Sequence, residues 1–142
     1  MRPYANTSYQ EAEILSAEPL QLVQLLYRGA LDEIVRARGC LAMRDIAGRS
    51  RAVNKAIRIV AELALSLNHE QGGEISRSLV ELYDYTQRLL IDANCRQVDG
   101  PLAEAQKLMT TLQEAWEHYR TATHRSAGGQ QDCEYTPISC AG

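Results

Sequence analysis

Three histidines, four cysteines and a set of acidic residues are the side chains in this sequence that could bind a metal ion. A di-iron site in a helical bundle needs a glutamate three residues before a histidine, so that both side chains project into one core. None of His69, His118 and His124 has a glutamate at that position. Glu114 and His118 are four residues apart, a spacing more typical of a contact on one helical face than of chelation. The sequence therefore predicts no metal site.

The cysteines are scattered along the chain. Cys133 and Cys140 lack the short spacing of zinc-binding pairs, and four isolated cysteines are too few for a disulfide framework. Cys40 and Cys95 stand among apolar neighbours near expected helix ends, which favours buried, inert thiols. Residues 1–10 are polar and do not resemble a secretory signal, so we expect reduced cysteines in a cytoplasmic protein.

Patterns for nucleophilic catalysis or nucleotide binding are missing from the sequence. There is no Gly-x-Ser-x-Gly motif, and Gly72-Gly73 is not followed by the Lys-Ser or Lys-Thr pair of a phosphate-binding loop. We therefore predict that the protein is not an enzyme and needs no cofactor.

Positive charge is concentrated in one stretch of the chain. Positions 36 to 58 contain seven basic residues and one acidic residue, Asp45, which gives this stretch a formal charge of +6. The rest of the chain then carries −9, since the net charge is −3. Such a stretch could bind phosphates. The overall acidity favours solvated positions around a helix–helix turn instead, so we expect no nucleic-acid partner. The seven residues are Arg36, Arg38, Arg44, Arg49, Arg51, Lys55 and Arg58.

Composition indicates which elements must position these side chains. The 142 residues are 45% hydrophobic and include no Phe, so a core must come from Leu, Ile, Val and Ala, which favours packed helices over a β-sandwich. The length corresponds to one ordinary domain. No apolar run approaches 18 residues, so we expect no direct insertion into a membrane.

Apolar residues recur with helical periodicity in four segments, at about 19–44, 50–67, 75–93 and 101–119. Ser50 is the expected N-cap of the second segment, and Asp99-Gly100-Pro101 is a start signal for the fourth. Short connections between long helices predict an all-α fold, an antiparallel four-helix bundle over residues 19–121. We expect residues 1–18 to form a short helical or extended segment that packs on the bundle, and residues 122–142 to form a disordered tail.

The first two helical segments carry more apolar surface than a bundle helix needs. Leu22, Leu26, Ile59 and Leu65 lie off the main core stripe. Neighbouring helices or the N-terminal segment could cover this surplus. It could equally form a docking surface for an amphipathic partner, and both hold if a partner displaces the N-terminal segment.

A series of short motifs runs in order along most of the chain. It begins with Tyr9-x4-Ile14-x-Ser16-Ala17-x-Pro19 and Leu26-Tyr27-x-Gly29-Ala30, and continues with Ala56-x2-Ile59-x2-Glu62-Leu63. It goes on through Gly72-Gly73-Glu74-Ile75, Leu79-x2-Leu82-Tyr83-x-Tyr85, Ala93-Asn94, Asp99 and Ala115-Trp116. Each piece is weak alone, but the ordered series across residues 9–117 is specific, and it resembles the FliS family of flagellin export chaperones.

The resemblance implies a cytoplasmic chaperone that binds the C-terminal segment of flagellin. Binding would prevent premature polymerisation and keep flagellin competent for flagellar type III secretion. The N-terminal segment is implied to cover the binding surface when it is empty, and its tyrosine region to engage the flagellar export gate. An adaptor for another flagellar regulator or export component is the alternative, and a homodimer of the free protein stays open.

Large apolar residues of the matching motifs and the apolar faces are the expected partner contacts. Tyrosine suits a surface that is alternately covered and exposed, because its hydroxyl stays wet while its ring is buried. Core packing is the competing interpretation for the whole set, and we favour it for Ile57 and Leu82. The expected contacts are Tyr9, Ile14, Leu22, Leu26, Tyr27, Ile57, Ala61, Leu65, Leu79, Leu82, Tyr83 and Tyr85.

Overall fold

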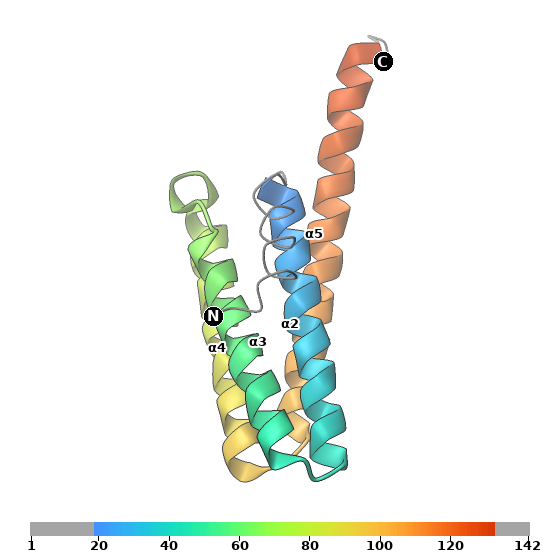
Figure 1. Ribbon diagram of the computed structural model, residues 1–142. Helices are drawn as coiled ribbons and strands as arrows, with labels where there is room; N and C mark the ends of the chain where they lie inside the picture. Colours follow the sequence, from blue (N-terminus) through green and yellow to red (C-terminus); the bar gives the residue numbers. More distant parts are fainter. Residues whose placement is uncertain (1–18, 133–142) are drawn as a thin grey trace, which may run out of the picture.

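The computed structural model describes residues 19–132, with side chains from 20 to 122, and over this range the chain forms four helices (Figure 1). They are α2 (Pro19–Ala42), α3 (Ile46–Leu65), α4 (His69–Arg96) and α5 (Gly100–Asp132). Each helix packs antiparallel against the next, and α5 closes the ring against α2. The predicted all-α antiparallel bundle is confirmed. The expected covering segment, residues 1–18, and residues 133–142 lie outside the described residues.

The turn between α2 and α3 places the start of α3 earlier than the sequence pattern predicted. Asp45, and not Ser50, is the N-cap, and its carboxylate accepts a hydrogen bond from the Gly48 N–H at 2.9 Å. A Cβ atom at Gly48 would touch that carboxylate and lie 2.9 Å from the Cys40 Sγ. Glycine therefore lets the cap form in a turn that Arg44 closes with a φ of 61°.

A second cap starts α4 inside the stretch that was expected to be a loop. The side chain of Asn68 accepts hydrogen bonds from the N–H groups of Glu70 and Gln71. Gly73 then takes a non-helical backbone conformation, with φ 53° and ψ −121°, that glycine adopts readily. A kink at Gly73 therefore separates the short capped start of α4 from the rest of the helix.

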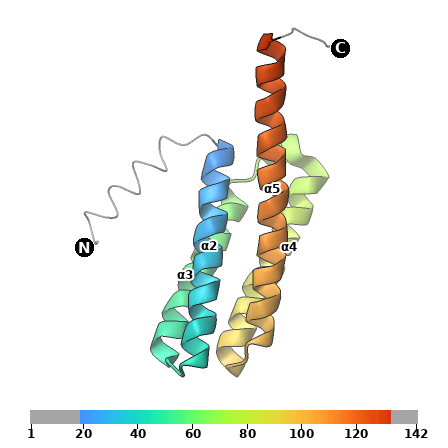
Figure 2. The same ribbon diagram turned by 90° about the vertical axis from the view of Figure 1, so that its right-hand side faces the viewer.

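α5 begins at Gly100, as the Asp99-Gly100-Pro101 signal predicted, but does not end near Thr121. It continues to Asp132 and projects beyond the other three helices (Figure 2). The apolar periodicity fades near Thr121 because α5 leaves its packing partners there, whereas helical backbone bonds are made within the helix itself. Residues 122–132 of the expected disordered tail therefore belong to α5 in this structure, and residues 133–142 lie outside the described residues.

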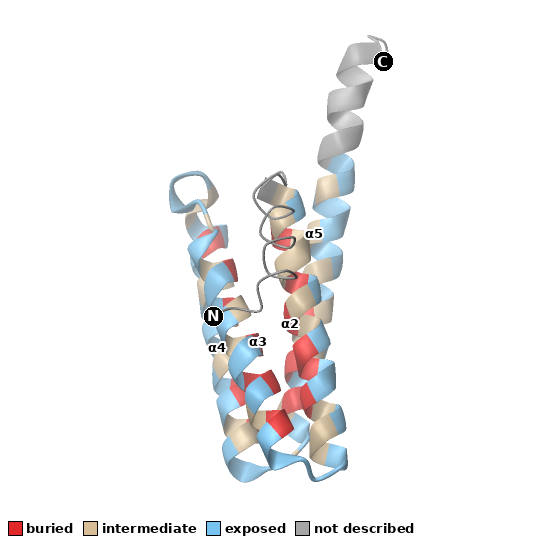
Figure 3. Cartoon of the chain, viewed as in Figure 1, coloured by how far each residue is buried: buried red, intermediate tan, exposed pale blue. Residues whose placement is uncertain are grey.

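The buried positions of the helices lie mainly on their inward faces (Figure 3), and most of them carry small or aliphatic side chains. Alanines recur on all four core-facing stripes and allow the helices to approach closely, while Tyr27 and Tyr83 are the aromatic residues buried among the described side chains. The buried set is Val23, Tyr27, Ala30, Ile34, Ala37, Ala52, Val53, Ala56, Val60, Leu63, Tyr83, Leu89, Leu90, Ala93, Leu102, Ala105 and Met109.

Candidate partner-binding site

A set of half-buried apolar side chains surrounds the core toward the end of the bundle where α2 begins and α3 passes into α4. All four helices contribute, so the set forms an apolar rim around this end of the core. Its members are Leu26 from α2, Ile59 from α3, Leu67 from the connection, Leu79 from α4, and Leu112 and Trp116 from α5. Each packs on the core yet keeps part of its surface in solvent. Incomplete burial of this kind leaves apolar area that a partner could cover.

Two tyrosines join diagonal helices directly beneath the rim. The hydroxyl oxygens of Tyr27 on α2 and Tyr83 on α4 are 2.7 Å apart and form one hydrogen bond, in which either hydroxyl can donate. The two rings pack edge to face, with centroids 6.3 Å apart. Burial raises the pKa of both phenols, and the Trp116 indole beside them offsets part of that rise. Both hydroxyls therefore stay neutral and satisfied inside the core, and the pair fixes the floor of the rim.

Close helix contacts hold the rim in place. Gly29 brings α2 so near to α3 that a Cβ atom there would lie 3.4 Å from the Ile59 side chain. On the other side, the Gln87 side-chain amide donates to the Ile57 carbonyl at 3.1 Å and ties α4 to α3. The Tyr85 hydroxyl donates to the Glu104 carboxylate, which joins α4 to α5 and raises the pKa of Tyr85.

The predicted contacts divide into three groups by burial. Tyr27 and Tyr83 are core residues in this structure and offer a partner no exposed surface. The half-buried residues are Leu22, Leu26, Ile57, Leu79 and Leu82, and the exposed residues are Ala61, Leu65 and Tyr85. Tyr9 and Ile14 lie outside the described residues. The tyrosines are buried because each hydroxyl finds its partner in the other, which spacing along the sequence does not reveal.

Sequence reasoning did not assign Leu112 and Trp116 of α5 to the site, although both lie on the rim. The available signal was the Ala115-Trp116 pair, since a bundle helix seldom needs so large a side chain on a stripe that is otherwise aliphatic. Trp116 also packs edge-to-face on Tyr119, with ring centroids 6.0 Å apart, so aromatic surface continues along α5 past the rim. Tyr119 is 57% exposed.

The basic stretch is largely used inside the bundle. Glu33 is 5% exposed. Its carboxylate accepts a hydrogen bond from Arg36 at 2.6 Å and forms an ion pair with Lys55 at 3.5 Å. Arg38 makes two hydrogen bonds to Asp99, which holds the pKa of that carboxyl below its usual value.

Arg49 is buried within the same stretch. It donates to the Asn94 side chain at 2.8 Å, so Asn94 of the Ala93-Asn94 motif has a structural partner. Three of the seven cations, Arg38, Arg49 and Lys55, thus link different parts of the bundle, whereas Arg36 pairs within α2.

A cleft of about 730 Å³ lies between the first half of α2 and the second half of α5. Its lining mixes amides with both signs of charge, and Glu114 and His118 both line it. Among the described residues no three His, Cys, Asp or Glu side chains come together as a metal site requires. None of the helices in residues 19–132 is long and apolar enough to cross a membrane.

Known proteins resemble the chain over nearly its whole described length. Residues 1–123 match the family model described as "Flagellar protein FliS". A flagellar secretion chaperone FliS from Salmonella typhimurium is 39% identical over 117 residues, which cover 82% of this chain and 86% of the relative. A protein of the same name from Bacillus subtilis is 34% identical over 114 residues, 80% and 83% of the two chains. This chain belongs to the FliS family.

Family membership makes the chain a flagellar export chaperone and not an enzyme. The flagellar secretion chaperone FliSB of Pseudomonas aeruginosa is also similar, at 32% identity over 117 residues, covering 82% of this chain and 92% of the relative. The family expected from the motif series is therefore confirmed. Within this FliS-family bundle, the apolar rim is the candidate partner-binding surface.

Proposed function

We propose that this FliS-family protein binds the C-terminal segment of flagellin in the cytoplasm, prevents its premature polymerisation and keeps it competent for flagellar type III secretion. The single observation that carries the proposal is the apolar rim, a half-buried aliphatic and aromatic surface in a family of flagellar export chaperones. No nucleotide or cofactor is needed for this task. The client is released when the export gate takes it.

The physical demand on such a site is large apolar area. A segment that orders on binding loses conformational entropy worth several kcal/mol, which apolar burial must offset. To cover Leu26, Leu79 and Trp116, a client segment would have to contact α2, α4 and α5, which carry one of these residues each. The mixed lining of the α2–α5 cleft suits the polar face of the same segment.

Residues 1–18 precede α2 in the sequence, and α2 carries Leu26 of the apolar rim. We include in the proposal that Tyr9 and Ile14 cover the rim in the absence of client and move away when flagellin binds. The displaced tyrosine region is then available to the flagellar export gate. Deleting residues 1–15 should raise affinity for flagellin and promote self-association. Unchanged affinity in a monomeric deletion variant contradicts this part of the proposal.

Calorimetric titration with a synthetic flagellin C-terminal peptide tests the proposal. Leu79→Ser on the rim should weaken peptide binding about tenfold or more, as expected for a central apolar contact. Ile91→Ser is the matched control, because Ile91 lies near the other end of the same helix and is 51% exposed. Circular dichroism checks that both variants fold. Equal loss of affinity in both variants, or in neither, means that the rim is not the site.

Co-purification with whole and truncated flagellin separates the proposal from the adaptor alternative. Flagellin that lacks its C-terminal segment should not bind. If the truncated protein binds as tightly as whole flagellin, the chaperone mechanism is wrong as stated. Binding of a flagellar regulator to the rim in place of flagellin would establish the adaptor.

A further inference from the structure

The outer face of α3 carries a regular pattern that the bundle does not use. The helix packs on α2 and α4 through its buried stripe, which includes Ala52, Val53 and Val60. The opposite side is exposed along its whole length. The exposed residues along the middle of that side, here called the α3 outer seam, are Ala47, Arg51, Asn54, Arg58, Ala61 and Leu65.

Seven-residue repeats run through the seam. Ala47, Asn54 and Ala61 form one series, and a second series starts four residues later with Arg51, Arg58 and Leu65. Residues at these spacings lie along one side of a helix, where a second helix could contact all of them. The first series is small and lets another helix approach closely. The second series carries two arginines and one large apolar side chain.

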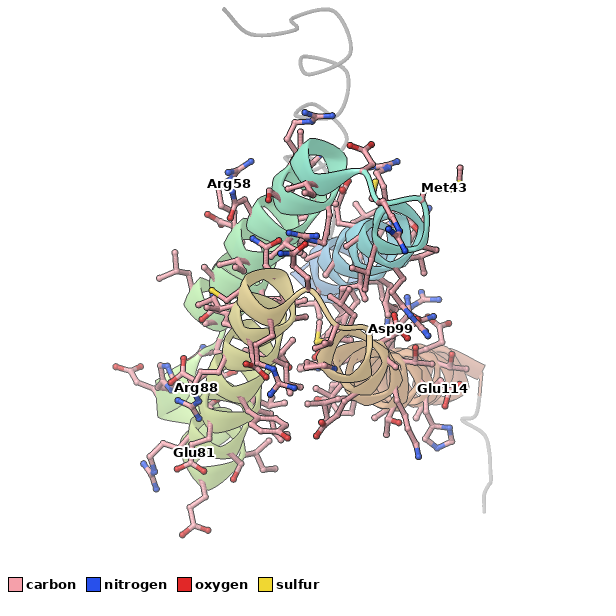
Figure 4. The ribbon with its side chains drawn as sticks, turned by 90° about the horizontal axis from the view of Figure 1, so that it is seen from below. Met43, Arg58, Glu81, Arg88, Asp99 and Glu114 are labelled. Atoms are coloured by element: carbon pink, nitrogen blue, oxygen red, sulfur yellow. The ribbon has the colours of Figure 1, made fainter. Side chains whose placement is uncertain are left out.

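The two seam arginines differ from the structural cations of the same stretch. Among the described residues, neither Arg51 nor Arg58 has an ion-pair partner, and Arg58 points away from the bundle (Figure 4). Lys55 lies at the edge of the seam and is held by Glu33 at 3.5 Å. Glu62 follows Arg58 by one turn, so the positive charge is confined to the first part of the seam.

We propose that the α3 outer seam packs against one helix of a second protein, whose carboxylates face Arg51 and Arg58 and whose apolar residue faces Leu65. Charge at seam positions selects a partner of opposite charge, since leaving an arginine buried without a carboxylate is costly. Leu65 is 77% exposed and supplies the apolar end of the contact.

A second copy of this chain does not fit the seam. In a two-fold antiparallel contact centred near Asn54, Arg51 of one copy would face Arg58 of the other, and a parallel contact would place like residues together. Nucleic acid fits less well than an acidic helix. The seam holds two unpaired arginines and no aromatic side chain, and Glu62 would repel a backbone that continued along it. The seam shares no residue with the apolar rim, although it includes Ala61 and Leu65, two of the flagellin contacts expected from the sequence.

Fluorescence anisotropy with a labelled synthetic helix tests the proposal on the full chain. The probe is a helical peptide of about three heptads. One of its two contact positions in each heptad is alanine, and the other is Glu in two heptads and Leu in the third. Arg51→Glu/Arg58→Glu should weaken its binding about tenfold or more. Arg77→Glu/Arg88→Glu makes the same change in charge on exposed residues of α4 and should leave binding unchanged. A probe with Lys in place of Glu should bind the Arg51→Glu/Arg58→Glu variant and not the unaltered protein.

Two further arms keep the result specific. A scrambled peptide of the same composition should bind at least about tenfold more weakly than the probe, because it lacks the heptad spacing. Equal binding of the scrambled peptide, or equal loss in both double variants, overturns the proposal in favour of general charge attraction. Binding to phosphatidylserine vesicles or single-stranded DNA without binding to the helical probe also overturns it.

Discussion

The Tyr27–Tyr83 hydrogen bond makes a sharp prediction about stability. Tyr83→Phe removes one hydroxyl and leaves the Tyr27 hydroxyl buried, at zero exposure, without its partner 2.7 Å away. An unsatisfied buried hydroxyl costs about 1–3 kcal/mol. We expect the free energy of unfolding to fall by that amount, with Tyr27→Phe giving a similar loss.

The double variant Tyr27→Phe/Tyr83→Phe should recover much of this loss. Removing both hydroxyls leaves two rings of nearly native shape and no buried polar atom to desolvate, so the change approaches neutrality. The Trp116 indole, which sits beside both phenols, is half-buried and can turn its N–H to water. The coupling energy between the two positions should therefore be about 1–2 kcal/mol, within the range for residues in contact.

Urea denaturation followed by far-ultraviolet circular dichroism measures all four free energies of unfolding. The midpoints should shift without a change in slope, because the unfolded surface is nearly the same. Two neutral single variants, or single losses that simply add in the double variant, would refute the reasoning. Either result would mean that the two hydroxyls do not satisfy each other in the folded protein.

Three further outcomes can be checked on the same protein. The pKa values of Tyr27 and Tyr83 are raised in the folded protein, so the phenols of the unfolded chain ionise first, near pH 10. The free energy of unfolding should therefore fall above pH 10 by about 1.4 kcal/mol per pH unit for each phenol. Urea denaturation at alkaline pH should show this slope in the unaltered protein and not in the double phenylalanine variant, and an equal slope in both contradicts the prediction. Asn94→Ala should lower the free energy of unfolding by at least about 2 kcal/mol, because buried Arg49 keeps its charge and loses its side-chain acceptor. Thermal or urea unfolding measures this loss, and a loss under about 0.5 kcal/mol contradicts the prediction. Gly48→Ala should lower the melting temperature by roughly 4 °C or more because its Cβ meets the capping carboxylate, and an unchanged melting temperature would count against the clash.

Periodicity was sufficient to predict the bundle because burial of an aliphatic stripe dominates the folding of each helix. Helix boundaries were less predictable, since competing caps differ by about 1 kcal/mol. Ser50 and Asp45 are both good N-cap residues, and the tight turn at Arg44 decides between them. Likewise, Asn68 starts α4 before Gly73, because a capped turn can continue through a kink.

The site was only partly predictable for a related reason. A large apolar residue on a helix stripe looks the same in sequence whether a neighbouring helix covers it fully or by half. Tyr27 and Leu26 are adjacent in the same motif, yet Tyr27 is fully buried and Leu26 is on the rim. The difference depends on a hydroxyl partner 56 positions away and on where the other helices end.

The charge pattern shows how one stretch can serve two purposes. Seven cations placed together in sequence suggested a single patch, but folding turns Arg49 inward and pairs Arg36 and Lys55 with one buried carboxylate. Arg44, Arg51 and Arg58 are exposed and have no ion-pair partner among the described residues, and Arg51 and Arg58 lie in line on the outer side of α3. Because Arg51 and Arg58 make no ion pair among the described residues, replacing them should leave stability within about 0.5 kcal/mol of the original while weakening acidic-helix binding about tenfold or more. Stability and partner selection can therefore be separated experimentally within a single helix.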